Sequence, residues 1–260
     1  MGAMFRGEAE KGRVGLLWPT VAMLAALAIL LGLGTWQLQR KAWKEGLLSD
    51  INARTMAEPI SLDDAMRRWR AGDDLEYVRV RVAGRFRHAR ERFYYAPGKD
   101  GPGFHVYTPL ETAAGPIVFV NRGFVPEHFK DQVGRRDGLP AGETVVIGLL
   151  RAPGVRGAFT PANDPKGNLW FWRDLAGMAD SALGAEATRA APFFLDAEAQ
   201  PGETWPKAGV TRLGLPNRHL EYALTWYGLA LALIGVYSVF IVGRMRRMRL
   251  DREAGHRPPG

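Results

Sequence analysis

The chain of 260 residues contains no cysteine. Disulfide bonds, thiolate zinc sites, iron–sulfur clusters and covalent c-type haem attachment are therefore excluded. Copper delivery through a cysteine pair is excluded as well, and the eight scattered methionines form no methionine-rich motif that would replace it. Any metal bound by this chain must be held by other side chains, above all histidine.

The signatures of common enzymes are also missing. The five histidines show neither a His-x-x-x-His nor a His-Glu-x-x-His spacing, and no Gly-x-Ser-x-Gly elbow occurs. The glycine- and proline-rich segment 97–103 reads as a loop but lacks the residue order of a phosphate loop. Because no nucleophile–base pair stands out, the sequence predicts a protein without catalytic residues.

A nucleic-acid partner is disfavoured by the way the charge is distributed. The formal net charge is +8, but the tail from Gly243 onward, with six arginines against Asp251 and Glu253, supplies +4 of it. No arginine-rich stretch is interleaved with stacking aromatic residues. The basic excess lies beside a hydrophobic run, where the bias of positive residues toward the cytoplasm explains it.

Two uncharged runs, Val14 to Gly34 and Tyr222 to Val242, are long enough to cross a bilayer, which takes about 20 apolar residues. The first run has a second interpretation, a cleaved signal peptide with a small-residue site at 32–34. The hydrophobic core of a signal peptide is usually about 7–15 residues, so the longer run favours an uncleaved anchor. The lipid bilayer is therefore an expected partner.

The arginines that follow the second run, from Arg244 to Arg249, indicate a cytoplasmic flank. Two spans then place both termini in the cytoplasm and the main domain in the periplasm of a bacterial inner (plasma) membrane. Arg40, Lys41 and Lys44 weaken the orientation signal of the first span. The predicted divisions are a cytoplasmic tail 1–13, a transmembrane helix 14–34, a periplasmic domain 35–218, a second transmembrane helix 219–242 and a basic cytoplasmic tail 243–260.

The middle of the chain reads as many short strands separated by glycine and proline turns. Residues 77–82 alternate strictly between valine and arginine after Tyr77, and a Ser61-x-x-Asp64 capping box predicts a helix to about Arg70. Another helix is predicted over 175–183. We expect two transmembrane helices flanking a periplasmic α+β domain dominated by an antiparallel sheet or small barrel; its further strands are predicted at 93–95, 104–109, 117–124, 143–151, 169–172 and 192–195.

His219 stands immediately before the second run, at the outer face of the membrane. On a helix, Ala223, Trp226 and Ala230 share its face. The alanines would leave room for a flat ring that Trp226 could bound, and neutral imidazole is a common ligand of metals and of haem iron. Asn217 would cap the start of this helix. The alternative is an interfacial histidine that is hydrogen-bonded to lipid headgroups.

The other candidate residues have more ordinary interpretations. Trp36, Arg40 and Trp43 lie on one helical face after the first run, where the tryptophans fit an interfacial belt. Arg40 would pair with lipid phosphate, an acidic group of the domain or a cofactor carboxylate. Among the remaining histidines, a structural residue in a strand is expected at His105, solvated turn residues at His88 and His128, and a residue of a disordered tail at His256.

Several segments together resemble the surfeit-locus-1 family of cytochrome c oxidase assembly proteins. The resemblance runs in order through nearly the whole chain. Phe124 stands where the family usually has tryptophan, and Arg218 where a second asparagine is common. The matching segments are 34–44 (GTWQLQRKAWK), 120–126 (VNRGFVP), 159–165 (FTPANDP) with Asn168, Trp170 and Asp174, and 216–220 (PNRHL) through 225–227 (TWY).

The resemblance implies a factor that helps mature the haem–copper oxidase by holding haem a and aiding its insertion into the core subunit, with haem a synthase as a further partner. It implies His219 as the haem-iron ligand. Arg40, Arg122 and Arg218 become candidates for the haem propionates, since guanidinium pairs well with carboxylates; a structural pair within the sheet is the alternative for Arg122. The competing function is a membrane scaffold that holds an oxidase subunit or haem a synthase without binding haem.

Overall fold

The computed structural model describes residues 4–98, 101–200, 202, 204–211 and 217–254, with side chains described from Leu16 to Leu250 within these ranges. The chain divides into two compact units. Residues 1–48 and 215–260 form the first, which we call the helical unit, and residues 49–214 form the second, the barrel unit.

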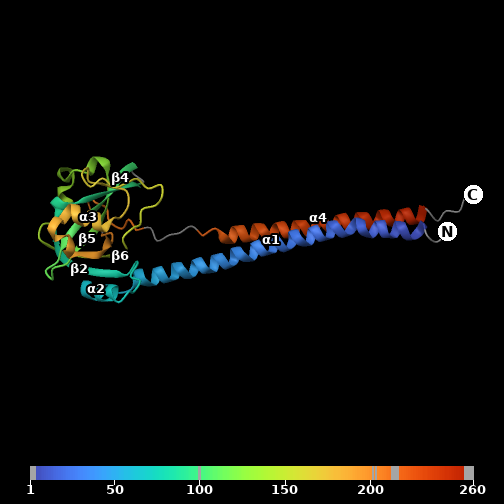
Figure 1. The fold of residues 1–260 in the computed structure, drawn as a ribbon, viewed down its shortest axis with the longest axis horizontal. Helices are drawn as coiled ribbons and strands as arrows, with labels where there is room; N and C mark the ends of the chain where they lie inside the picture. Colours follow the sequence, from blue (N-terminus) through green and yellow to red (C-terminus); the bar gives the residue numbers. More distant parts are fainter. Residues whose placement is uncertain (1–3, 99–100, 201, 203, 212–216, 255–260) are drawn as a thin grey trace, which may run out of the picture. The chain divides into compact units, whose positions relative to one another are not determined.

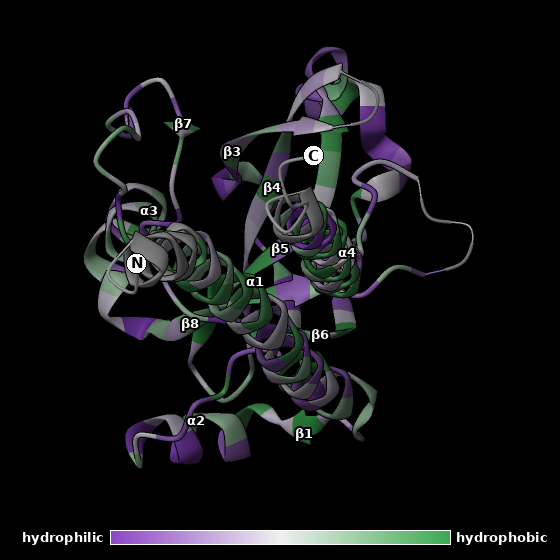
Figure 2. Cartoon of the chain, turned by 90° about the vertical axis from the view of Figure 1, so that its right-hand side faces the viewer, coloured by the Kyte–Doolittle hydropathy of each residue, from purple (hydrophilic) through white to green (hydrophobic). Residues whose placement is uncertain are grey.

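The helical unit is built from two long helices, α1 (Met4–Met56), whose last turns belong to the barrel unit, and α4 (His219–Ala254). Both contain stretches that are long and apolar enough to cross a membrane, Leu16–Met56 in α1 and His219–Leu250 in α4, with mean hydropathies of 2.3 and 1.9 in their most apolar windows. Figure 2 shows hydrophobic residues along both helices. Since a helix rises about 1.5 Å per residue, α1 is far longer than the bilayer core of about 30 Å.

Five strands of the barrel unit close into a barrel. The order around it is β2-β6-β8-β5-β4, and β2 returns to β4 through the pairs Arg85↔Glu111 and Phe86↔Leu110. Three further strands extend the sheet: β1 lies on β2, β3 on β4 and β7 on β3. The strands are β1 (Ile60–Ser61), β2 (Arg79–Phe86), β3 (Arg92–Gly98), β4 (Gly101–Glu111), β5 (Ile117–Pro126), β6 (Glu143–Arg151), β7 (Leu169–Trp170) and β8 (Ala190–Ala197).

The barrel is mixed rather than purely antiparallel. Its pairings are antiparallel except for β5 with β8, which run parallel. Parallel neighbours need a long crossover connection, and here that connection contains α3 (Leu175–Leu183). The expected two membrane helices around an α+β domain with a small barrel are therefore confirmed, with one parallel pairing that the short-strand pattern did not reveal.

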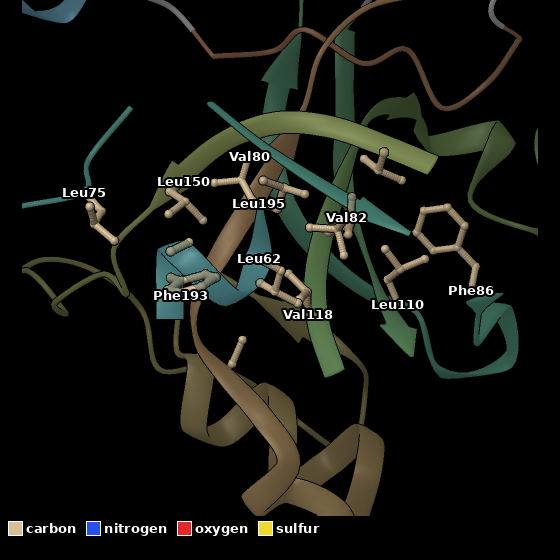
Figure 3. Close-up of a cluster of buried hydrophobic side chains, with 14 residues drawn as sticks. Leu62, Leu75, Val80, Val82, Phe86, Leu110, Val118, Leu150, Phe193 and Leu195 are labelled. Carbon is tan, nitrogen blue, oxygen red and sulfur yellow. The ribbon is translucent and has the colours of Figure 1, made fainter. Parts of the chain in front are cut away.

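Alternation along the strands divides most of the core into two clusters, and a smaller third cluster is formed by Phe104, Val106 and Val125. In β5, Val118 and Val120 belong to the first cluster, together with Leu195 of β8 (Figure 3). Their neighbours Ile117 and Phe119 belong to the second. Because successive side chains of a strand point to opposite faces, the apolar runs of β5 and β8 each supply both of these clusters.

Two short helices cover these clusters. α2 (Leu62–Arg70) buries Leu62 and Ala65 in the first cluster, and Trp69 packs edge-on against Phe193 with ring centroids 5.6 Å apart. The predicted cap of α2 is confirmed, since the Ser61 side chain accepts from the backbone N–H of Asp64. α3 packs on the second cluster. The remaining helical turns are η1 (His88–Arg90), η2 (Glu127–Phe129), η3 (Gln132–Gly138) and η4 (Gly184–Arg189).

Some predicted boundaries differ from the structure. β6 and α3 begin and end as predicted, but β2 begins at Arg79 because Tyr77 has a φ of 65° and cannot continue a strand. The prediction of a loop over 97–103 is wrong for most of the segment. Pro97 and Pro102 are paired residues of the β3–β4 hairpin. Residues 99–100, which separate these strands, lie outside the described residues, as does the tail that contains His256.

Candidate functional site

The helices α1 and α4 lie side by side (Figure 1). Among the residues that the structure describes, side-chain hydrogen bonds join them at three levels. The partners on α1 have falling residue numbers while those on α4 rise, so the helices are antiparallel. Hydroxyl and amide groups that bond across helices help to hold such pairs in an apolar environment. The pairs are Gln37 with His219 (2.8 Å), Thr35 with Tyr227 (3.1 Å) and Thr20 with Tyr237.

His219 is the first residue of α4, and its side chain is half-buried. Its Nδ1 lies 2.8 Å from Oε1 of Gln37. Since an amide oxygen only accepts, Nδ1 carries the proton and donates it. Nε2 makes no hydrogen bond with any residue that the structure describes. A neutral imidazole whose second nitrogen is held by an outer partner is the form in which histidine ligates metals.

Asn217 does not cap α4, so that prediction is wrong. The first turn begins at the carbonyl of Arg218, which accepts from the backbone N–H of Tyr222 at 3.3 Å. The Asn217 side-chain oxygen is instead the one buried side-chain polar atom without a hydrogen-bond partner among the described residues. A buried acceptor of this kind is costly, and it lies two residues before His219.

The small residues of α4 are already covered. Ala223 and Ala230 are only 1% and 2% exposed, so the chain itself occupies the face that was expected to admit a flat ring. Close packing continues at Tyr227, because a Cβ added to Gly34 of α1 would lie 2.8 Å from its ring. Trp226 is half-buried on the same helix. A flat ligand at His219 would therefore have to approach away from the two alanines.

Two of the three predicted arginines lie in the helical unit. The guanidinium of Arg40 stacks 4.0 Å above the ring of Trp43, and both residues are exposed. Arg218 pairs with Glu221 at 3.1 Å, and both of these side chains are about 70% exposed. An exposed ion pair of this kind contributes at most about 1 kcal/mol, so Arg218 can exchange its partner readily.

Arg122 belongs instead to a buried polar cluster of the barrel unit, centred on Glu91. Its guanidinium lies 3.6 Å from the Glu91 carboxylate and donates to the backbone oxygen of Gly138. Arg135, whose side chain is fully buried, holds the same carboxylate through two N–H groups. Burial raises the pKa of Glu91, but hydrogen bonds from His88 and Arg135 and the charge of Arg135 outweigh it and lower the pKa to about 2. These contacts favour the structural alternative for Arg122.

Arg122 also lines a cavity of about 410 Å³ beside Phe86. Asp137 and Glu198 line the same cavity. Carboxylates in the lining disfavour an anionic ligand in the cavity, so it adds no support for a propionate at Arg122.

The segment around Arg122 has structural roles that explain its sequence. Asn121 is buried, donates to Asp196 at 2.9 Å and accepts from the backbone N–H of Gly123. Gly123 has a φ of 114°, and a Cβ there would lie 1.9 Å from the backbone oxygen of Lys207. Only glycine tolerates both conditions. The 120–126 motif therefore maintains the barrel.

Three further histidines, His88, His105 and His128, lie in the barrel unit. His128 is exposed, as expected, and the ring of His105 lies in the strand β4 between Tyr94 and Phe124. His88 was expected to be solvated, which is wrong. Its Nε2 lies 3.0 Å from the carbonyl of Pro140 and its Nδ1 faces Arg122. No group of three or more potential metal-ligating side chains occurs among the described residues.

Two important residues were missed by sequence reasoning. Gln37 lies within the helical segment that attracted attention for its tryptophans, and no pattern in that segment indicates its contact with His219. Glu91 stands in a run of charged residues that reads as solvent-exposed, and nothing in that run indicates its burial.

Comparison with known proteins gives a consistent relationship. The sequence profile of the SURF1 family matches residues 24–231. Surfeit locus protein 1 of Homo sapiens is 39% identical over 77% of this chain and 70% of its own length, and that of Mus musculus is 37% identical over 81% and 71%. A SURF1-like protein of Monosiga brevicollis is 33% identical over 96% of this chain and 95% of its own length. The matched range includes every predicted site residue.

Proposed function

The chain belongs to the SURF1 family, and from this premise we propose that it is an assembly factor for the haem–copper cytochrome c oxidase. In this proposal it holds haem a at the outer membrane interface and aids its insertion into the core subunit, with haem a synthase as the source of the cofactor. It acts by binding and release rather than by catalysis.

The observation that carries the proposal is the state of His219. Its Nδ1 is held by Gln37, and its Nε2 has no partner among the described residues. An imidazole in this state can act as an axial ligand of haem iron. Haem a, when bound, would supply the iron and two propionates. The single-histidine arrangement without a covalent link suits a carrier that must later release its cargo.

The surroundings of His219 fit a ligand in part. The buried, unpartnered oxygen of Asn217 can accept a hydrogen bond from a polar group or water of a bound molecule. Arg218, which is weakly paired, and Arg40 are the arginines that would hold propionates in this proposal. Trp226 would contact the ring edge. Arg122 is the least supported of the candidates because the Glu91 cluster already uses its guanidinium.

The same proposal places the protein in a bacterial inner membrane as a two-pass protein. The antiparallel pair of apolar helices and the arginines from Arg244 to Arg249 support cytoplasmic termini and a periplasmic barrel unit. In that orientation His219 lies at the periplasmic end of α4, where a cofactor would meet the core subunit.

A scaffold function is the second candidate, and one observation favours it. The loop between β6 and β7 presents Val155 and Phe159, which are 92% and 102% exposed. The loop is held by hydrogen bonds, including Arg156 Nε to the carbonyl of Thr160 at 2.9 Å. Exposed apolar side chains on an ordered loop suit a protein partner such as an oxidase subunit.

An optical spectrum of the full chain, purified in detergent after co-expression with the haem a biosynthetic enzymes, tests the proposal. We expect a reduced haem a band in the natural protein and in His128→Ala, which removes an exposed histidine, and its loss in His219→Ala. A colourless natural protein with an intact fold would overturn haem binding and favour the scaffold. A band unchanged in His219→Ala would remove His219 as the ligand.

A further inference from the structure

We propose that Gln37 is a positioning residue for His219, holding its imidazole in the tautomer that presents an unprotonated Nε2. The inference begins with one contact that joins the two helices, the 2.8 Å distance between Gln37 Oε1 and His219 Nδ1. A neutral imidazole carries one proton, so a fixed acceptor at Nδ1 places the lone pair on Nε2.

The helix pair keeps this acceptor in place. Thr35 and Tyr227 are bonded at 3.1 Å within three turns of the site, and Thr20 is bonded to Tyr237 farther along the pair. The close approach of Gly34 to the Tyr227 ring sets the spacing between the helices. Gln37 is therefore presented by a packed interface rather than by a free surface.

The neighbouring glutamine shows that the placement is specific. Gln39 lies two residues farther along α1 and is exposed, whereas Gln37 is half-buried. Residues two apart on a helix do not share a face. Gln39 therefore offers the same side chain in nearly the same place without the contact, which makes it a matched control.

An amide differs from a carboxylate in a way that matters for a ligand. A carboxylate at Nδ1 would pull the proton more strongly and make Nε2 a stronger donor to a metal, while an amide fixes the tautomer with a neutral hydrogen bond. Gln37 thus gives His219 a defined orientation and a defined tautomer. The identity of the metal as haem iron rests on the proposed function; the hydrogen bond and the tautomer do not.

The tautomer can be measured without any cofactor. The full chain, labelled with ¹⁵N-histidine and held in detergent at a pH where imidazole is neutral, is studied by NMR, with His219→Ala to assign the signals. We expect His219 to show a pyrrole-like Nδ1 and a pyridine-like Nε2, and Gln39→Leu to leave both unchanged. In Gln37→Leu the ¹⁵N signals of both ring nitrogens should move to chemical shifts averaged over the two tautomers. Gln37→Glu should restore the natural pattern.

A second readout uses haem a added to the same variants. Gln37→Leu should retain haem about 10- to 100-fold less tightly, as is typical for loss of an outer partner of a metal-bound histidine. Gln37→Glu should retain it and lower its reduction potential, a change that a merely structural role would not produce.

The outcomes separate the two proposals. A protonated Nε2 in the natural protein, or a His219 pattern that Gln37→Leu leaves unchanged, would overturn the role of Gln37 whatever happens with haem. If the tautomer pattern is found but no variant retains haem, the role of Gln37 stands and the proposed haem function fails.

Discussion

His88 in the barrel unit and His219 in the helical unit are both half-buried, yet they are bonded differently. His88 uses both ring nitrogens, with Nε2 on the carbonyl of Pro140 and Nδ1 facing Arg122 and the carboxylate of Glu91. His219 uses one nitrogen, which faces Gln37. The second nitrogen of His219 has no partner within the described part of the chain.

The difference separates a structural histidine from one that can take a ligand. Around His88 the polar groups satisfy each other: Glu91 accepts from Arg135, Gln132 and Thr108. Around His219, one imidazole nitrogen and the buried oxygen of Asn217 have no hydrogen-bond partner among the described residues. A ligand could be bound at the second site without first breaking an ion pair, whereas at the first it would have to displace one.

The largest expected effect comes from Glu91→Leu. Removing the carboxylate leaves the fully buried guanidinium of Arg135 without its charge partner, which should cost the barrel unit about 3–5 kcal/mol of unfolding free energy. Hydrogen exchange of the full chain in detergent, followed by mass spectrometry, should show faster exchange in β5 and unchanged protection in α4. The control Glu221→Leu, which removes only the exposed pair with Arg218, should change neither by more than about 1 kcal/mol. Equal loosening of both units by Glu91→Leu would contradict the comparison.

The same carboxylate predicts the acid sensitivity of the barrel unit. The pKa of Glu91 is about 2 in the folded chain against an ordinary value of 4.5. Its contribution is therefore complete above pH 4.5 and disappears as the pH falls toward 2, a loss of about 3 kcal/mol. The free energy of unfolding of β5, measured by hydrogen exchange in urea, should fall more steeply between pH 4.5 and 2 in the natural protein than in Glu91→Gln. Parallel curves for the two proteins would show that Glu91 is not the group responsible.

Removal of His88 and removal of His219 should have opposite effects on barrel stability and on haem a binding. His88→Ala leaves the Pro140 carbonyl and one face of the Glu91 cluster unsatisfied, so we expect a loss of about 1–3 kcal/mol in the barrel unit. The haem a band per folded molecule should stay unchanged. His219→Ala should lose the haem a band and leave the stability of the barrel unit unchanged. A loss of pigment in His88→Ala at full folding would remove the distinction between the two histidines.

Overpacking the helix interface should affect the helical unit alone. In Gly34→Leu the new side chain collides with the Tyr227 ring, at an expected cost of about 1–3 kcal/mol. Gly32→Leu is the matched control because nothing lies within 4 Å of a Cβ there. Since the chain has no natural cysteine, cysteines introduced at Thr20 and Tyr237 can report the pairing, and their cross-linking yield should fall only in Gly34→Leu. A similar fall in both variants would contradict close packing at Gly34.

Local patterns predicted the elements well. The valine alternation placed the buried face of β2, with Val80 and Val82 at 0% and 2% exposure, and the Ser61 cap and the bounds of α3 followed from short-range chemistry. His219 was identified because a ligand-capable side chain beside a hydrophobic run is unusual. The histidine's position at the start of α4 was also predictable, since the run begins three residues later.

Long-range contacts could not be predicted from local sequence patterns. Gln37 and His219 are 182 residues apart, and no periodicity along one segment reveals a partner in another. Glu91 and Arg135 are 44 residues apart, and both look like surface charges by their neighbours. The alanine face of α4 was misjudged for the same reason: small residues fit a ligand and a neighbouring helix equally well, and here the chain covers them.

The parallel pairing of β5 with β8 has a consequence for how the protein is made. The buried hydrogen bond between Asn121 and Asp196 spans 75 residues, so a large loop must close before the pairing yields any stability. Contacts this distant in sequence slow folding. During synthesis the edge of β5 that pairs with β8 stays exposed until residue 196 has left the ribosome. The barrel therefore closes late, only shortly before α4 is synthesised, and that interval is when the chain is most prone to aggregate.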